Sequence, residues 1–343
     1  MASSKTIKTI VFNVIASKKI GLGHIYRAIA MARLMQPDFN SIIFCKRSHY
    51  DYCLKIFPKY KKIQSYTNQE NFFQQLEKIG PSLVINDVLS TSKHYMGKLK
   101  NKNYPIINFE DLGSGSGLAN LVLNELYDSA LNTNTNALWG HKYYLLRDEF
   151  LNRKPTVFKK KVRGILITFG GTDQNNFSLL ALNQVIKLSK LKKFKIFVVI
   201  GAGYSYFKSL KKAIREYQKN GSDIELIFHT GKMSQIMNQC QIGIASNGRT
   251  VYELCYMRIP SIILSHHERE LGHSFADPHR GFIPVGLYQK GATEQKIREN
   301  IEKLLLDNAF RKQLYSNNAK VKFHQNKKKL KQLILEIIEN EVH

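Results

Sequence analysis

The segment TIVFNVIASKKIGLGHIYRAIAMARLM, residues 9–35, decides the fold class. Its first part, 9–16, is a mostly apolar run with the character of a strand. The glycine turn GLGH at 21–24 follows, and apolar residues then recur at helical spacing as far as Met35. A strand, a glycine turn and an amphipathic helix in this order are typical of a βα unit in a parallel sheet.

The same alternation of strand and helix patterns continues along both halves of the chain. Further strand-like runs lie at 41–45, 82–87, 105–111, 164–169, 194–200, 224–228, 242–246, 261–265 and 282–287. Residues 112–160 are less regular and contain one short predicted strand, LVLNEL at 121–126. The basic stretch NRKPTVFKKKVR at 152–163 is interpreted as an interdomain linker. We therefore predict an α/β protein with two Rossmann-like domains, 1–155 and 156–325, and a C-terminal helix at 326–343.

Length and composition agree with two globular domains. The chain has 343 residues, of which 43% are hydrophobic and 23% charged, and this excludes disordered, collagen-like and coiled-coil proteins. The longest apolar runs are far shorter than a bilayer requires, so we predict no stable membrane insertion. The first apolar run contains Asn13 and leads into a glycine motif rather than a cleavage site, so we expect no signal peptide.

Cysteine usage and net charge narrow the function further. The four cysteines include no CxxC pair, which argues against a disulfide framework or a structural zinc site and fits a reducing, cytoplasmic compartment. The net charge of +26 favours anionic partners, namely nucleic acid, acidic lipid or phosphorylated small molecules. Because the lysines are scattered, we interpret their densest cluster, 320–332, as a solvated helix face, with contact to a membrane or to RNA as the alternative.

The GLGH turn indicates a ligand site of a particular kind. A dinucleotide fingerprint would need glycine where Tyr26 stands, and no acidic residue ends the next strand, so an NAD site is excluded. The exposed N–H groups of the helix start favour an anion. The positive end of the helix also favours a neutral imidazole at His24, which suits a general base. The alternative is a histidine that caps or packs against the helix.

Two loops of the second half could hold phosphate groups. In TFGGTD, 168–173, a strand ends in two glycines before a helix, which fits either a phosphate cradle or an ordinary glycine turn without a ligand. In ASNGRTVYE, 245–253, Thr250 can act as an N-cap with Glu253 three residues on, which fits a capping box. The functional alternative places phosphate at 247–250 and the Glu253 carboxylate on a ribose diol.

Polar residues at other strand ends add candidates. HHERELGH, 266–273, fails the H-E-x-x-H test for zinc, so we predict no metal there. We favour a loop that contacts sugar, with a solvated helix start as the alternative. Asp87 and Asp111 each close a strand of the first half, where acids face substrate in such sheets. Either carboxylate could instead cap the following helix.

Five segments in order resemble one family. They are GLGHIYRAIAMA (21–32), INFEDL (107–112), ALWGHKYYLLRDEF (137–150), ILITFGGTD (165–173) and IASNGRTVYELCYMRIPSIIL (244–264). With them, the chain resembles the nucleotide-sugar hydrolases of the pseudaminic acid pathway and their spore-coat polysaccharide relatives. These are related to MurG-type glycosyltransferases. The loop at 266–273 departs from the family, which often carries Asn-Gln where this chain has Arg269-Glu270.

The resemblance implies a fold, a reaction and a pathway. The fold is GT-B, two Rossmann-like domains with a central cleft. The reaction is hydrolysis of a UDP-linked diacetamido sugar at the anomeric carbon, without metal or cofactor, for synthesis of nonulosonic acids such as pseudaminic acid in surface glycans. The resemblance assigns activation of water to His24. A general base typically contributes ~10²–10⁴ in rate.

The resemblance also implies the remaining site residues. Around the nucleotide it places Gly170, Gly171, Thr172, His229, Thr230, Ser246, Asn247, Gly248, Arg249, Thr250 and Glu253. Around the sugar we expect Gly23, Tyr26, Arg27, Asp87, Asp111, His267, Arg269 and Glu270.

Two other functions stay open at this point. A MurG-like glycosyltransferase would use the same UDP-sugar donor site and require an acceptor. A non-catalytic binder of nucleotide or RNA would explain the net charge, but no aromatic-basic recognition motif is present, so we predict no nucleic acid partner. The partner that we expect is a small UDP-sugar, and no oligomeric state is implied.

Overall fold

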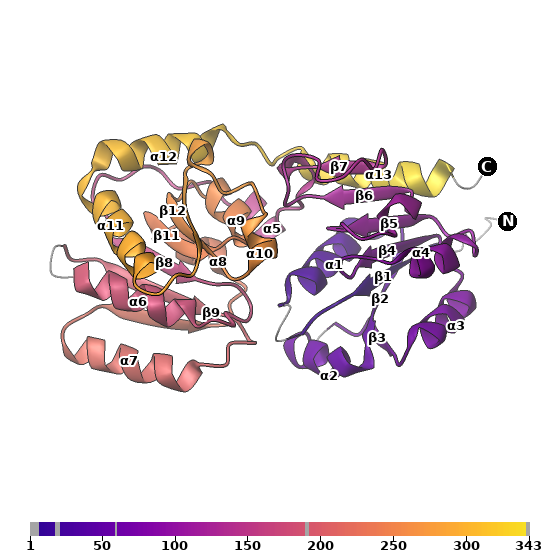
Figure 1. The fold of residues 1–343 in the computed structure, drawn as a ribbon, viewed down its shortest axis with the longest axis horizontal. Helices are drawn as coiled ribbons and strands as arrows, with labels where there is room; N and C mark the ends of the chain where they lie inside the picture. The colour runs from indigo at the N-terminus through magenta and orange to yellow at the C-terminus, as the bar shows by residue number, and fades with distance from the viewer. Residues whose placement is uncertain (1–6, 18–20, 59, 189–191, 341–343) are drawn as a thin grey trace. The chain divides into compact units, whose positions relative to one another are not determined.

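The computed structural model describes residues 7–17, 21–58, 60–188 and 192–340. Its contacts divide the chain into two units (Figure 1). The first unit comprises Met1–Leu145 and Gln325–His343, and the second comprises Leu146–His324. Each unit contains one sheet whose strand pairs are all parallel, with helices in the connections. The predicted α/β class with two Rossmann-like domains is confirmed.

The first unit alternates strands and helices from its start. Its elements are β1 (Thr9–Val14), α1 (Gly23–Leu34), β2 (Asn40–Lys46), α2 (Arg47–Ile56), β3 (Ile63–Tyr66), α3 (Gln69–Ile79), β4 (Leu83–Asp87), α4 (Lys93–Lys100), β5 (Ile106–Phe109), η1 (Ser116–Leu118), β6 (Leu121–Asn124), β7 (Ala137–Trp139), η2 (His141–Tyr143) and α13 (Asn326–Asn340). The short strands β3 and β7 were not predicted.

The second unit follows the same plan. Its elements are α5 (Asp148–Leu151), β8 (Gly164–Thr168), α6 (Phe177–Leu188), β9 (Lys195–Ile200), α7 (Phe207–Lys219), β10 (Ile224–Phe228), α8 (Met233–Met237), β11 (Ile242–Ser246), α9 (Thr250–Tyr256), β12 (Ser261–Ser265), α10 (Glu268–Leu271), η3 (Pro278–Arg280), β13 (Phe282–Leu287), α11 (Ala292–Leu306) and α12 (Asn308–Lys320). The strands predicted for this half are all present.

The order of the strands defines one special point in each sheet. The first sheet has the order β3-β2-β1-β4-β5-β6-β7, and the second has the order β10-β9-β8-β11-β12-β13. The chain therefore reverses its direction of travel between β1 and β4, and again between β8 and β11. In open parallel sheets, ligands bind at the carboxyl ends of the strands beside such a reversal.

A ladder of asparagines runs across the centre of the first sheet. Asn13, Asn86 and Asn108 stand opposite one another on β1, β4 and β5. The Asn86 amide donates to Asn108 Oδ1 at 2.9 Å, and Tyr95 donates to Asn86 Oδ1 at 2.6 Å. All three asparagines are almost completely buried. Because each amide has partners within the ladder, the sheet carries polar groups through its core without orphaned donors.

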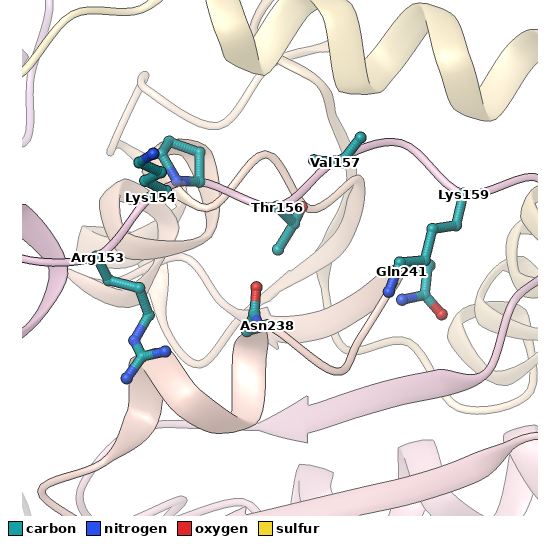
Figure 2. Close-up of a pocket in the computed structure, with 8 residues that line it drawn as sticks. Arg153, Lys154, Thr156, Val157, Lys159, Asn238 and Gln241 are labelled. Atoms are coloured by element: carbon teal, nitrogen blue, oxygen red, sulfur yellow. The ribbon is translucent and has the colours of Figure 1, made fainter.

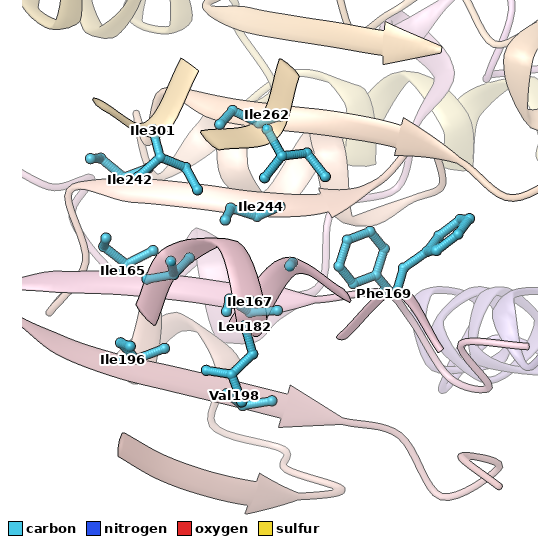
Figure 3. Close-up of a cluster of buried hydrophobic side chains, with 14 of the residues drawn as sticks. Ile165, Ile167, Phe169, Leu182, Ile196, Val198, Ile242, Ile244, Ile262 and Ile301 are labelled. Atoms are coloured by element: carbon cyan, nitrogen blue, oxygen red, sulfur yellow. The ribbon is translucent and has the colours of Figure 1, made fainter. Parts of the chain in front are cut away.

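The core of the second unit is aliphatic by contrast. Figure 3 shows β8, β9, β11 and β12 contributing isoleucine and valine side chains, which meet residues of α6 and α11. These strands are buried on both faces, which explains their nearly continuous apolar sequences. The rigid aliphatic core fixes the strand ends that carry the loops described below.

The final helix returns to the first unit. α13 contacts η2, and it buries Leu330, Ile334 and Ile338. Its lysines, which belong to the predicted solvated face, remain at the surface, and Lys331 pairs with Asp38. The end of the predicted helix, 341–343, lies outside the described residues. The domain limits at 155 and 325 and the central cleft stay predictions.

We predict that Asn86→Ala destabilises the first unit by about 2–4 kcal/mol, because it leaves the buried amides of Asn13 and Asn108 short of partners. The only tryptophan, Trp139, lies in this unit, so urea unfolding followed by its fluorescence reports on it. Asn101→Ala, at the exposed C-cap of α4, serves as the control and is expected to change stability by less than about 0.5 kcal/mol. Equal effects would contradict a special role for the ladder.

Candidate functional site

The reversal point of the first sheet brings His24 and Asp87 together. The GLGH turn begins with Gly21 at a φ of +95°, a conformation that favours glycine, and α1 starts at Gly23. His24 is therefore the second residue of the helix that follows β1, while Asp87 ends the neighbouring strand β4. The Nδ1 atom of His24 lies 2.6 Å from Asp87 Oδ1. When Nδ1 donates to this carboxylate, Nε2 is left as the basic nitrogen.

Arg27 fixes the Asp87 carboxylate from the other side. One helical turn after His24, its Nε donates to Asp87 Oδ2 at 2.7 Å and its Nη2 donates to Oδ1 at 2.6 Å. Burial alone raises the pKa of Asp87, but the charge of Arg27 and the bonds from His24 and Arg27 outweigh it, so the pKa lies below its ordinary value. Asp87 is thus held as an anion that orients the imidazole.

Two carboxylates that we did not predict complete this cluster. Arg27 Nη1 lies 2.7 Å from Glu125 Oε1 and 3.4 Å from Glu110 Oε1, and the guanidinium lies 4.7 Å from the centre of the Phe109 ring. Burial lowers the pKa of Arg27, yet the surrounding carboxylates raise it by more. Glu110 and Glu125 follow β5 and β6, so the signal that could have found them is an acid directly after each of two neighbouring strands.

The other predicted sugar residues of the first unit have different surroundings. The Asp111 carboxylate accepts hydrogen bonds from the backbone N–H groups of Thr91 and Gly113, and from the side chains of Thr91 and Asn108. It therefore ties two loops together, which matches a structural role. Tyr26 packs its ring edge-on against Phe57 at 4.9 Å.

At the reversal point of the second sheet, glycines shape the loop after β8. Gly170 has a φ of +76°. A Cβ on Gly201 would lie 2.3 Å from the Gly171 carbonyl oxygen, so the loops after β8 and β9 touch through their backbones. Thr172 follows in the same loop, and Asp173 accepts from Phe177 and Ser178 N–H at the start of α6. The acid of the TFGGTD motif is thus a helix cap.

The turn from β11 to α9 carries five predicted nucleotide residues, Ser246, Asn247, Gly248, Arg249 and Thr250. Asn247 Nδ2 donates to the carbonyl oxygens of Glu270 and His273, which fastens the turn to the loop after β12. Thr250 is the first residue of α9 rather than its N-cap, and Arg249 at the cap position forms no side-chain cap bond. The predicted capping box is therefore wrong.

The Glu253 carboxylate has a partner far away in the sequence. Arg147 Nε donates to Glu253 Oε1 at 2.8 Å, across 106 positions of the chain. Burial raises the pKa of Glu253, and the charge of Arg147 offsets part of this rise. Arg147 was not predicted as a site residue, although it lies within the segment 137–150 that carries the resemblance.

Glu270 stands against the β11–α9 turn. A Cβ on Gly248 would lie 3.6 Å from Glu270 Oε1, while Oε2 accepts from the His266 N–H at 2.8 Å. Burial raises the pKa of Glu270 to about 7. Arg269 beside it is half-buried, and the exposed His267 caps α10 by accepting from the Glu270 N–H.

His266, which we did not single out, stacks on Phe177 with ring centres 4.8 Å apart. Burial lowers the pKa of this histidine to about 4, which keeps its ring neutral.

His229 and Thr230 follow the edge strand β10, with β9 between them and the reversal point. His229 has a φ of +45° and Thr230 Oγ1 accepts from the Lys232 N–H. Both residues lie at the carboxyl edge of the sheet, as the other predicted nucleotide residues do. Among the described residues, no observed hydrogen bond joins them to the β11–α9 turn.

Within the described residues, no group of three or more histidine, cysteine, aspartate or glutamate side chains is arranged to hold a metal ion. A search of the same residues finds no helix that is both long and apolar enough to cross a bilayer.

Comparison of structures shows that the chain has the GT-B fold. Acinetobacter baumannii MurG superposes with a TM-score of 0.64 over 96% of this chain and 99% of that one, at 13% identity. The spinosyn rhamnosyltransferase SpnG gives 0.62 over 97% and 100%, at 10% identity. Anabaena HepE in complex with UDP-glucose gives 0.58 over 97% and 99%, at 13% identity. The expected fold is confirmed.

Sequence comparison gives distant relatives. An uncharacterized protein of Methanocaldococcus jannaschii, MJ1062, is 28% identical over 266 residues, which cover 74% of this chain and 54% of that protein. The match thus spans about half the length of this relative. The spore coat polysaccharide biosynthesis protein SpsG of Bacillus subtilis is 22% identical over 275 residues, covering 75% and 78%. The sequence matches no family model.

We predict that Glu270 makes the second unit less stable as the pH rises. The pKa of Glu270 is about 7 in the folded protein, against an ordinary value of 4.5. Its contribution to stability is therefore complete below pH 4.5, and it is lost as the pH rises through about 7. Glu270→Gln should therefore be the more stable protein by about 1–3 kcal/mol at about pH 8, with a smaller difference at about pH 5.

Denaturation followed by circular dichroism at both pH values measures this difference. The exposed Glu216→Gln on α7 is the matched control, for which no pH-dependent change is expected. A Glu270→Gln protein whose stability parallels that of the wild type at both pH values would refute the prediction.

Proposed function

We propose that the protein is an enzyme that acts on a UDP-activated sugar, breaking the bond between the anomeric carbon and the diphosphate. The GT-B fold supports this proposal, together with neighbours described as a rhamnosyltransferase and as a UDP-glucose complex. The single observation that carries it is the His24–Asp87–Arg27 arrangement at the reversal point of the first sheet.

In the proposed mechanism His24 is the general base. Asp87 holds the Nδ1–H of His24, so Nε2 accepts the proton of the attacking hydroxyl or water. The oxygen then forms a bond to the anomeric carbon while the bond to the UDP oxygen breaks, and UDP leaves with the electron pair. As the imidazole becomes charged, the Asp87 carboxylate stabilises it, in the way the buried aspartate of a catalytic triad does.

The second unit is proposed to hold UDP. Backbone N–H groups of the glycine loop after β8 and of the β11–α9 turn would neutralise the diphosphate, which makes UDP a better leaving group. Arg249 in that turn adds a positive charge. Glu253 is proposed to accept hydrogen bonds from the two ribose hydroxyls, and His229 and Thr230 to lie near the base.

Two reactions share this machinery. Transfer to an acceptor hydroxyl is the better supported, because the neighbours include a rhamnosyltransferase. Hydrolysis of a UDP-linked diacetamido sugar for surface-glycan synthesis is the second candidate, and the similarity to a spore coat polysaccharide biosynthesis protein supports a role in polysaccharide formation. Release of UDP from the donor alone, measured against release with added acceptor sugars, separates the two.

We predict that His24→Ala lowers UDP release by about 10²–10⁴-fold, because the nucleophile loses its base. Asp87→Asn should lower it by at least about tenfold, since the amide cannot stabilise the charged imidazole. UDP release is measured with a panel of UDP-amino sugars and UDP-hexoses. UDP affinity, measured by calorimetry, should stay within about twofold of wild type in both variants.

The exposed His94→Ala on α4 is the control and should retain full activity. Loss of UDP binding together with turnover in the His24 variant would make His24 a structural residue and would remove the proposed mechanism.

We also predict that Glu253 senses the ribose. Glu253→Gln should weaken UDP binding more than it weakens binding of 2′-deoxy-UDP, with a coupling energy of about 1 kcal/mol between the side chain and the hydroxyl. Calorimetric titration of both proteins with both nucleotides gives this coupling. If the substitution weakens the two nucleotides equally, Glu253 acts through Arg147 and not through the ribose.

A further inference from the structure

A pocket of about 280 Å³ opens in the second unit, away from the proposed nucleotide loops. Its lining residues are Arg153, Lys154, Pro155, Thr156, Val157, Lys159, Asn238 and Gln241 (Figure 2). Gln241 directly precedes β11, so the pocket lies at the amino ends of the strands. The glycine loop and the β11–α9 turn lie at the opposite, carboxyl ends. The pocket is therefore separate from the proposed active site.

The residues that line the pocket carry a net positive charge. Arg153, Lys154 and Lys159 contribute three cations, and no acidic residue lines it. In the part of the chain that the structure describes, none of the three forms an ion pair with a carboxylate, whereas Lys195 and Arg147 of the same unit do. The stretch that supplies them, 152–163, contains no acid at all. Their combined field favours an anion.

The wall that carries these cations is fixed in place. Backbone carbonyl oxygens of Arg153 and Thr156 accept from the hydroxyls of Tyr256 and Tyr315, and those of Lys159 and Lys160 accept from Arg311. Arg311 is almost completely buried. Because buried side chains hold the carbonyls of this segment, the segment is ordered before any ligand arrives, which reduces the entropy cost of binding.

Polar groups in the pocket can complement an oxyanion. Arg153 Nε donates to Ser234 Oγ at 3.1 Å, which orients the guanidinium and leaves its two terminal nitrogens available as a fork. The exposed Asn238 side chain lies below Thr156 in Figure 2, and no side-chain hydrogen bond of Asn238 is observed among the described residues. The lining of the pocket thus includes a guanidinium, lysine ammonium groups and an amide, which are the types of donor that phosphate oxygens accept from.

We infer that the 153–159 pocket is a second anion site, which binds a phosphate-type oxyanion of the size of pyrophosphate or a small phosphate ester. The inference does not depend on the proposed function, because it uses none of the residues assigned to catalysis or nucleotide binding. According to this inference, the basic stretch 152–163, which is interpreted as a linker from its sequence, also binds a ligand.

Titration with sodium pyrophosphate, followed by NMR of the Asn238 side-chain amide, tests the inference at the site itself. We expect a saturable shift of this signal, and an affinity at least about tenfold weaker in the double variant R153A/K159A. The double variant K208A/K212A removes the same charge from the exposed face of α7 and should stay within about twofold. A parallel titration with UDP shows whether the oxyanion that the pocket binds belongs to a nucleotide diphosphate or to a free phosphate anion.

Two results would overturn the inference. One is a chemical shift of the Asn238 amide that stays constant, or changes without reaching saturation, with pyrophosphate and with UDP alike. The other is equal weakening in the two double variants, which would mean that the net charge of the chain and not the pocket attracts the anion.

Discussion

The buried pair between Arg27 and Asp87 is the interaction on which the arrangement of the first unit depends. Both side chains are at most 3% exposed, so each charge depends on the partners that surround it, and each is a principal partner of the other. Removing one partner of such a pair typically costs about 3–5 kcal/mol, because the remaining charge stays buried. The same pair joins the helix after β1 to the end of β4 and sets the carboxylate that His24 contacts. Stability and the chemistry proposed for His24 therefore rest on the same two side chains.

The end of β4 is polar on both faces of the sheet. Asn86 and Asp87 are consecutive, so their side chains point to opposite faces. Asn86 belongs to the asparagine ladder on one face, while Asp87 belongs to the ion cluster on the other. The strand is aliphatic over Leu83–Ile85 and ends with two buried polar residues. These residues can be buried because the register of the strands places a hydrogen-bonding partner beside each of them. Such sites are costly to build unless every member is satisfied.

The sequence alone was enough to predict the alternation of strands and helices, because the apolar period is strong in both halves. It also placed His24 in the first turn of a helix and Asp87 at a strand end. Their contact could not be predicted, because it depends on the strand order, which local periodicity does not contain. Asp111 was chosen where Glu110 makes the contact with Arg27, since a shift of one residue at a strand end changes the face. The capping box failed because α9 begins at Thr250 itself, and the Glu253 carboxylate instead accepts from Arg147, 106 positions earlier. The strands β3 and β7 were missed because they have only four and three residues, too few to establish a period of two.

The return of α13 to the first unit makes the second unit an insertion. Residues 146–324 form one continuous stretch, whereas the first unit is assembled from two stretches that flank it. Asn326 secures the returning stretch by donating to the carbonyl oxygens of His141 and Tyr144. In the gene, the second unit is encoded by one continuous segment, so it can be replaced without changing the segments that encode the first unit. The first unit is encoded by two separate segments, so no single uninterrupted segment encodes all of it.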